Sequence, residues 1–135
     1  MSFELHPRLA ADTAFVTDLE LSRVLLMNDQ RYPWLVLVPR LVNAREVHRL
    51  SAEVQARLWQ ETTDAAAALD TLYQPDKMNI GAIGNLVPQL HVHVVARRVS
   101  DPSWPQPVWG VGEPEAYNEA ALERRVTEIR ERLTQ

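Results

Sequence analysis

The sequence contains no cysteine. This absence excludes disulfide bonds, thiol nucleophiles, iron–sulfur clusters and the common zinc sites built on cysteine. A chain of 135 residues, of which 46% are hydrophobic, can still bury a core without disulfides or a structural metal. We therefore expect one domain over residues 1–135, with no cofactor and no metal.

Long apolar runs and an excess of basic residues are missing as well. No stretch approaches the roughly 20 apolar residues of a membrane span, and residues 1–21 lack the basic start and apolar run of a signal peptide. The formal net charge of −4 does not suggest a broad surface for the phosphate backbone of nucleic acid. We expect a cytoplasmic protein without a membrane or a polymeric nucleic acid as partner, although a single nucleotide needs only a local pocket.

The first third of the chain carries strand patterns. Residues 13–27, TAFVTDLELSRVLLM, mix alternation with an apolar end and predict two short strands. Residues 34–38, WLVLV, form a continuous apolar run between two prolines and predict a buried central strand.

Two helices are predicted around these strands. Apolar residues recur at helical spacing from about Ser51 to Tyr73, where Ser51 is a candidate N-cap, and again over residues 114–133, where Pro114 can occupy the first turn. The charged residues on the other face of each helix are interpreted as solvated surface. The prediction is an α+β domain with its core at about residues 13–110, followed by a C-terminal helix at about 114–133.

The residues suited to chemistry gather between the two helices. Side chains alternate across a strand, so Gln89, His91 and His93 are predicted to share one face, with about 7 Å between neighbours. The apolar residues between them face the other way, and such a polar row is a poor way to build a core. Gly81 and Gly84, just upstream, permit positive φ and the close approach of a ligand.

This ordered set resembles the histidine triad (HIT) family, whose signature is His-φ-His-φ-His-φ-φ, where φ is apolar, after a Gly-rich loop. The matching row runs from Gln89 to Val95 and has glutamine in place of the first histidine. The resemblance extends over about residues 15–110 and includes LeuLeuMetAsn at 25–28 and a Trp-Pro tail at 101–110. It implies a HIT-like antiparallel sheet of about five strands packed with helices, in a homodimer.

The resemblance also implies a mechanism. By position, His91 is the nucleophile that attacks the α-phosphate of a nucleotide and forms a nucleotidyl-histidine, which water then resolves. A neutral imidazole suits this step, because it is nucleophilic at neutral pH and can leave again. His93 would bind phosphate or orient its neighbours. Gln89 can donate and accept hydrogen bonds in place of the missing histidine, but it cannot carry a proton.

Five further residues are implied to bind the nucleotide. Asn28 falls where a polar residue holds the ribose, and Asn85 falls where an amide contacts the α-phosphate. Asn79 occupies a supporting polar position near the phosphate, and Gly84 belongs to the loop beside it. Arg97 shares the histidine face by strand alternation and is a candidate to neutralise phosphate.

Other interpretations of the histidines stay open at this point. His91 and His93 can be half-buried strand residues held by backbone carbonyls, or they can chelate a divalent ion, although no third ligand is evident. The favoured function is a hydrolase or nucleotidyl transferase that acts on a dinucleoside polyphosphate or a nucleoside phosphoramidate. The alternative is a nucleotide-binding or regulatory protein with little turnover, which the glutamine at position 89 favours. Trp104 and Trp109, in the tail, are weakly assigned to an interface or a lid.

Overall fold

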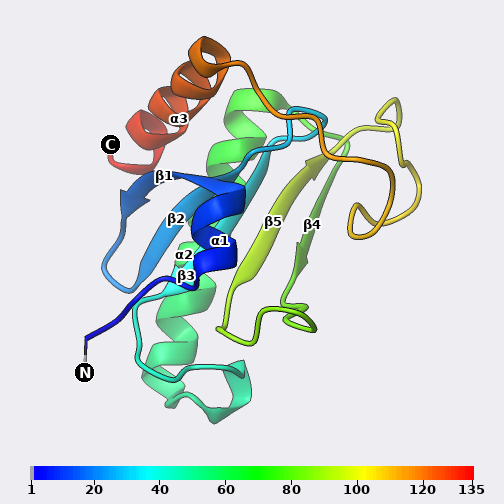
Figure 1. The fold of residues 1–135 in the computed structure, drawn as a ribbon. Helices are drawn as coiled ribbons and strands as arrows, with labels where there is room; N and C mark the ends of the chain where they lie inside the picture. Colours follow the sequence, from blue (N-terminus) through cyan, green and yellow to red (C-terminus); the bar gives the residue numbers. More distant parts are fainter. Residues whose placement is uncertain (1) are drawn as a thin grey trace.

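The computed structural model describes residues 2–135, in which five strands form one sheet with helices on both of its faces (Figure 1). The elements are, in chain order, α1 (Pro7–Asp12), β1 (Thr13–Asp18), β2 (Ser22–Met27), β3 (Trp34–Pro39), a 3-10 helix (Val47–Arg49), α2 (Ala52–Tyr73), β4 (Lys77–Gly81), β5 (Val92–Arg97) and α3 (Glu119–Leu133).

The sheet has the strand order β1-β2-β3-β5-β4, and every neighbouring pair is antiparallel. The predicted α+β fold with an antiparallel sheet of five strands is therefore confirmed. All six residues of β3 are buried, as its apolar sequence predicts. All six residues of β5 are buried too, because this strand pairs with β3 on one side and with β4 on the other.

Alternate residues of the inner strands face two different cores. Leu35 and Val94 pack against α2 and α3, whereas Val36 and Val95 pack in a second cluster that includes Leu9 of α1. Figure 1 shows α2 behind the sheet and α1 in front of it. Burial of each of these aliphatic side chains contributes about 1.5–3 kcal/mol. Because His93 lies between Val92 and Val94 in β5, its side chain belongs to the face that α1 covers.

The long helix α2 begins and ends as its sequence predicts. The Ser51 side chain accepts a hydrogen bond from the main-chain N–H of Val54 and caps the N-terminus. The helix ends at Tyr73, after which Gln74 adopts a left-handed conformation with φ of 48° and Pro75 follows. This helix packs its apolar stripe on the sheet and defines the rear of the molecule.

The C-terminal helix α3 is shorter than predicted, because it begins at Glu119 and not at Pro114. The N-cap is Asn118, whose side chain accepts from the main-chain N–H of Ala121. The residues before the cap bind to the loop after β2: Gln30 donates to the Glu115 carbonyl at 2.7 Å. These contacts hold the chain in an extended path, so Pro114 does not start a helix.

Helix α1 was not predicted from the sequence. Its Pro7 occupies the first turn, and the His6 side chain caps it by accepting a hydrogen bond from the Arg8 N–H at 3.0 Å. With six residues, the helix is too short for a periodic apolar pattern. Its one buried residue, Leu9, is enough to anchor it on the sheet.

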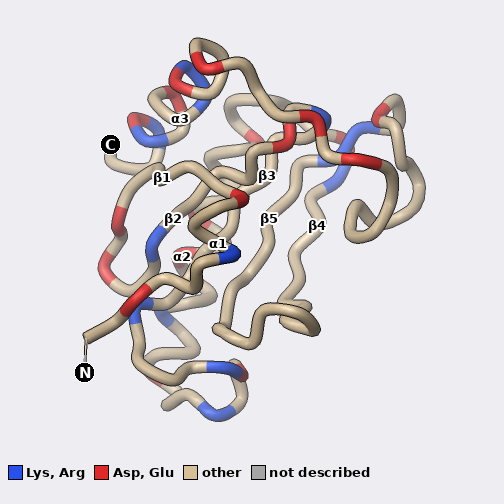
Figure 2. Tube along the Cα trace, in the orientation of Figure 1, with Lys and Arg blue, Asp and Glu red and all other residues tan. Residues whose placement is uncertain are grey.

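Charged residues are spread over the helices and loops. Figure 2 shows acidic and basic residues in close succession along α3 and few charges on the central strands. Helix α2 is 22 residues long, but several of these residues are charged. Among residues 2–135, no helix combines the length and the apolar character needed to cross a membrane.

Candidate active site

His91 and His93 lie where β5 begins. His93 is the second residue of the strand and pairs with Val36 on β3 and with Gly81 on β4. His91 is the last residue of the loop before the strand. The two ring centroids are 4.9 Å apart, and the residues are 6% and 5% exposed. The structure therefore brings the two predicted histidines together, with a small part of their surface open to a ligand.

A main-chain carbonyl determines which nitrogen of His91 is free. His91 Nδ1 is 2.7 Å from the carbonyl oxygen of Gln89. Because a carbonyl oxygen can only accept, Nδ1 must carry the hydrogen in this contact. In the neutral ring, Nε2 then keeps its lone pair, which is the state that a nucleophile requires.

An indole determines the opposite arrangement in His93. Trp34 Nε1 donates a hydrogen bond to His93 Nδ1 at 3.0 Å, and an indole nitrogen can only donate. The hydrogen of the neutral His93 ring is therefore on Nε2. Burial, and to a lesser extent the neighbouring His91, lower the pKa of His93 to about 4. The pair thus offers a lone pair on one imidazole and an uncharged N–H donor on the other.

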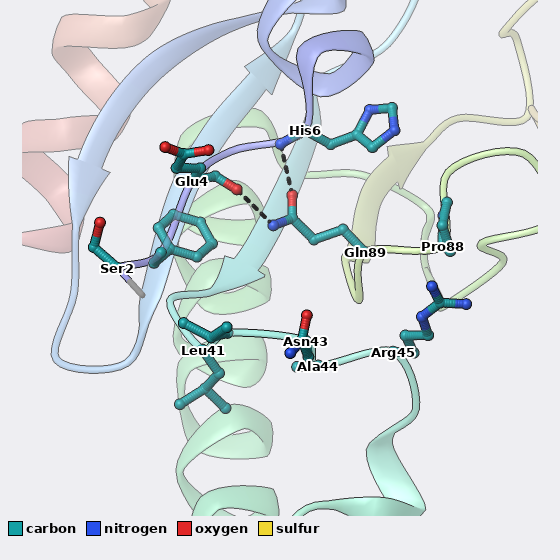
Figure 3. Close-up of a pocket in the computed structure, with 11 residues that line it drawn as sticks. Ser2, Glu4, His6, Leu41, Asn43, Ala44, Arg45, Pro88 and Gln89 are labelled. Atoms are coloured by element: carbon teal, nitrogen blue, oxygen red, sulfur yellow. Dashed lines mark hydrogen bonds between the residues drawn. The ribbon is translucent and has the colours of Figure 1, made fainter.

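The structure corrects the predicted row of three side chains at Gln89. Strand β5 begins at Val92, so Gln89 lies outside it. The Gln89 side-chain amide accepts from the His6 N–H at 2.8 Å and donates to the Glu4 carbonyl at 2.9 Å, as Figure 3 shows. The amide therefore binds the N-terminal segment and does not extend the histidine pair.

This amide imitates one residue of a strand. In a parallel ladder, one residue accepts and donates hydrogen bonds on either side of a single residue of its neighbour. The Gln89 side chain makes the same two contacts on either side of Leu5. Since the Gln89 carbonyl also holds His91, a single residue connects the N-terminal segment to the orientation of the candidate nucleophile.

Aromatic side chains surround His93. The Trp34 and Trp109 ring centroids lie 5.7 and 5.3 Å from that of His93, and the two indoles meet edge to face. Trp109 Nε1 is buried without a hydrogen-bond partner within residues 2–135. The sequence gave no sign of the contact with Trp34, because an aromatic residue at the start of an apolar strand is usually part of the core. The weak assignment of Trp109 to an interface or a lid stays a prediction.

Asn28 lies in a cavity of about 410 Å³ that Trp34 also lines. The cavity is formed by α1, the end of β2 and the tail after β5, and includes Arg8, Asp12 and Val108. The Asn28 side chain accepts a hydrogen bond from the Tyr117 N–H at 3.0 Å, which leaves its NH₂ group without a partner in the described residues. Through Trp34 this cavity adjoins the histidine pair.

Asn79 and Arg97 bind to each other at the far end of the sheet. Arg97 is four residues beyond His93, about 13 Å along the strand, and is 1% exposed. Its guanidinium donates to Asn79 Oδ1 at 2.8 Å and forms an ion pair with Asp101 at 2.8 Å. Burial raises the pKa of Asp101, but the hydrogen bonds and charge of Arg97 outweigh it and the net shift is downward. The phosphate roles of Asn79 and Arg97 stay predictions, since both side chains are engaged here.

The loop between β4 and β5 contains Gly84 and Asn85. Gly84 has a φ of 66°, which side-chain-bearing residues rarely adopt, and it lines a second cavity together with His91. Asn85 is exposed in this loop. Its contact with an α-phosphate stays a prediction.

The described residues offer the histidines no further metal ligand. In residues 2–135, no group of three or more His, Asp or Glu side chains is arranged to hold a metal ion. A zinc site needs at least three protein ligands, so His91 and His93 do not meet this requirement here.

The fold and the histidine pair together define the class of this protein: an α+β domain with a HIT-like sheet and two adjacent imidazoles at the start of an inner strand. The sequence model of the HIT domain matches residues 8–100, and the chain belongs to the HIT family. Both the predicted resemblance and the predicted fold class are confirmed.

Solved structures of bacterial histidine triad proteins are similar over nearly the whole chain. One from Bradyrhizobium japonicum is 44% identical with a TM-score of 0.95, and covers 98% of this chain and 99% of its own. One from Sinorhizobium meliloti is 45% identical with a TM-score of 0.94, and covers 96% of each chain. One from Marinobacter aquaeolei is 43% identical with a TM-score of 0.96, and covers 100% of this chain and 98% of its own. A search of curated proteins gives no match.

Proposed function

We propose that this protein is a hydrolase or nucleotidyl transferase that acts at the α-phosphate of a nucleoside derivative, with His91 as the nucleophile. The observation that carries the proposal is the 2.7 Å contact between His91 Nδ1 and the Gln89 carbonyl, because it leaves Nε2 free to attack. Membership of the HIT family supports the same role for this histidine.

The reaction has two steps. His91 Nε2 forms a bond to the α-phosphorus while the bond from phosphorus to the leaving group breaks, and the leaving group takes the electron pair. The positive charge that develops on the imidazole is stabilised by the Gln89 carbonyl through the Nδ1 hydrogen. Water, or an acceptor in a transferase, then attacks phosphorus, the electron pair returns to Nε2, and the attacking oxygen loses its proton.

His93 acts as an uncharged donor in this scheme. Its Nε2–H is available to a phosphate oxygen because Trp34 occupies Nδ1. The low pKa keeps the ring neutral at physiological pH, so His93 supplies a hydrogen bond and no net charge. Trp109 Nε1, a buried donor without a partner in the described residues, is typical of a site that a ligand completes.

The cavity at Asn28 is the proposed nucleoside site. It adjoins the histidine pair through Trp34, and the unpaired NH₂ group of Asn28 is suited to a ribose hydroxyl. The substrates that fit are a dinucleoside polyphosphate or a nucleoside phosphoramidate, handled by a homodimer in the cytoplasm as the family resemblance implies.

A nucleotide-binding or regulatory protein with little turnover is the second candidate. It is favoured by one observation: neither Gln89, which has no labile proton, nor His93, whose pKa is about 4, can act as a general acid at neutral pH. Such a protein would bind nucleotide at Asn28 without forming a covalent intermediate.

Trapping the intermediate tests the proposal. The protein is mixed briefly with α-labelled diadenosine triphosphate and with an α-labelled adenosine phosphoramidate, then quenched in acid and, because phosphoramidates hydrolyse in acid, in alkali as well. We expect label on the wild-type protein and on the His48→Ala control, whose histidine is exposed, and none on His91→Ala.

Three results would contradict the nucleophile assignment. Unchanged turnover in His91→Ala would exclude it directly. Saturable nucleotide binding without label in either quench would favour the binding protein. Turnover that gives no label at any early time would favour direct attack by water.

A further inference from the structure

The cavity that His91 lines opens next to a second one. The first, here called the inner cavity, has a volume of about 230 Å³ and is bounded by His91, Gly84 and Arg45 among others. The second, the outer cavity, has a volume of about 290 Å³ and lies between the N-terminal segment and the 41–45 segment. Both are lined by Arg45, Pro88 and Gln89, so the two cavities share one wall.

Arg45 is the cation on this shared wall. Its side chain has no hydrogen bond or ion pair with any residue in the described part of the chain, in contrast to Arg31 and Arg97, which are paired with aspartates. Figure 3 shows the guanidinium extending toward Pro88, between the 41–45 segment and the loop before β5. An unpaired guanidinium beside a nucleophile is available to an anionic ligand.

The other polar groups around the two cavities are mostly donors. His6 Nδ1 accepts from the Arg8 N–H, so the hydrogen of the neutral ring is on Nε2. Asn43 adds an amide to the outer cavity. Glu4 also lines it, but Figure 3 shows its carboxylate on the side away from Arg45. Glu46 lines the inner cavity and is the one carboxylate beside Arg45 there.

We propose that Arg45 and the inner and outer cavities form a subsite for an anionic, phosphate-containing leaving group. The inference rests on the proposed function and narrows its substrate class to nucleoside polyphosphates. A leaving group that departs through the cavity shared by His91 and Arg45 passes the guanidinium. The P–O bond breaks with its electron pair on the departing phosphate oxygen, which leaves as an anion and needs no proton.

The same site is poorly suited to an amine. Cleavage of a P–N bond requires a proton on the departing nitrogen, and neither Gln89 nor the neutral His93 can deliver one. The guanidinium would also repel a protonated amine. Arg45 is therefore a specificity-determining residue that favours phosphate leaving groups.

Two measurements test the subsite. The first is binding of inorganic tripolyphosphate by titration calorimetry, which does not depend on turnover. The second is kcat/KM for diadenosine triphosphate and for an adenosine phosphoramidate, each repeated with the guanosine form. The variants are Arg45→Ala, Glu46→Gln and the matched control Arg49→Ala, whose arginine is exposed and lines neither cavity.

Loss of a hydrogen bond to a charged ligand predicts about tenfold weaker tripolyphosphate binding in Arg45→Ala. Glu46→Gln should bind it more tightly, because a repelling carboxylate is removed, and Arg49→Ala should match the wild type. The kcat/KM of Arg45→Ala should fall about tenfold more for diadenosine triphosphate than for the phosphoramidate.

The subsite and the proposed function fail in different ways. Equal tripolyphosphate binding in Arg45→Ala and wild type, or equal losses on both substrates, would overturn the subsite while the His91 intermediate could still be trapped. Absence of the intermediate would overturn the proposed mechanism, and the tripolyphosphate titrations would still decide the role of Arg45.

Discussion

The contact between Gln89 and the N-terminal segment gives a prediction about stability. Gln89→Ala removes both hydrogen bonds of the amide and leaves the Glu4 carbonyl and the His6 N–H without their partner. Each such bond contributes about 0.5–1.5 kcal/mol, and the Glu4 bond is exposed, so we expect a loss of about 1–2 kcal/mol. For a chain of this length that loss lowers Tm by about 3–8 °C.

Thermal unfolding followed by circular dichroism measures the loss, and amide hydrogen exchange locates it. The His6 amide should exchange faster in Gln89→Ala, whereas the amides of β5 should keep their protection. The matched control is Gln60→Ala, which removes one exposed side-chain hydrogen bond to Asp64 on α2. That change should alter the free energy of unfolding by less than about 0.5 kcal/mol.

The chemistry of position 89 gives a sharper test. Gln89→Glu keeps the acceptor for His6 but replaces the donor to Glu4 with an oxygen, and Gln89→His cannot reproduce the parallel donor and acceptor of an amide. Both should therefore fall short of wild-type stability. Deletion of residues 2–5 should make a further Gln89→Ala change nearly neutral, because the two act on one contact. A wild-type Tm in Gln89→Ala, or additive effects with the deletion, would refute the proposed tie.

Two further predictions concern His93 and Gly112. The folded-state pKa of His93, about 4, lies below its ordinary value of 6.5, so the unfolded chain binds the proton first and stability is lost as pH falls from about 6.5 to 4. Urea unfolding across this window should show a loss of up to about 3 kcal/mol that His93→Gln reduces and His48→Gln does not; equal slopes in all three would contradict it. Gly112 has a φ of 68°, and a Cβ there would lie 2.7 Å from Arg31 Nη1. Gly112→Ala should therefore lower stability by more than the roughly 1–2 kcal/mol of backbone strain alone, which Gly110→Ala measures because it has positive φ and open space around it.

The main elements of the fold could be predicted because their signals are local. Alternation and apolar runs located the strands β1 to β3, and the Ser51 cap located α2. The start of α3 was missed because Pro114 is compatible with a first turn, whereas a contact between Gln30 and Glu115 holds the chain extended. Those two residues are far apart in the sequence, and no local pattern reports their contact.

The candidate site divides in the same way. The spacing of His91 and His93 was enough to predict that they lie together, and their rings are 4.9 Å apart. The partners of Gln89 could not be predicted, because His6 is 83 residues away in the sequence. The Trp34 donor to His93 spans 59 residues and was missed for the same reason.

The two histidines differ in how firmly they are held, and this difference suits their proposed roles. His93 is inside β5, paired on both sides, and its ring is bonded to Trp34 and packed against Trp109. His91 lies one residue outside the strand and is oriented by the carbonyl of a loop residue. A donor that stabilises charge is most effective when its position is preorganised. A nucleophile must instead move toward phosphorus as the bond forms, and the end of a loop next to a rigid strand permits a small displacement without breaking the sheet.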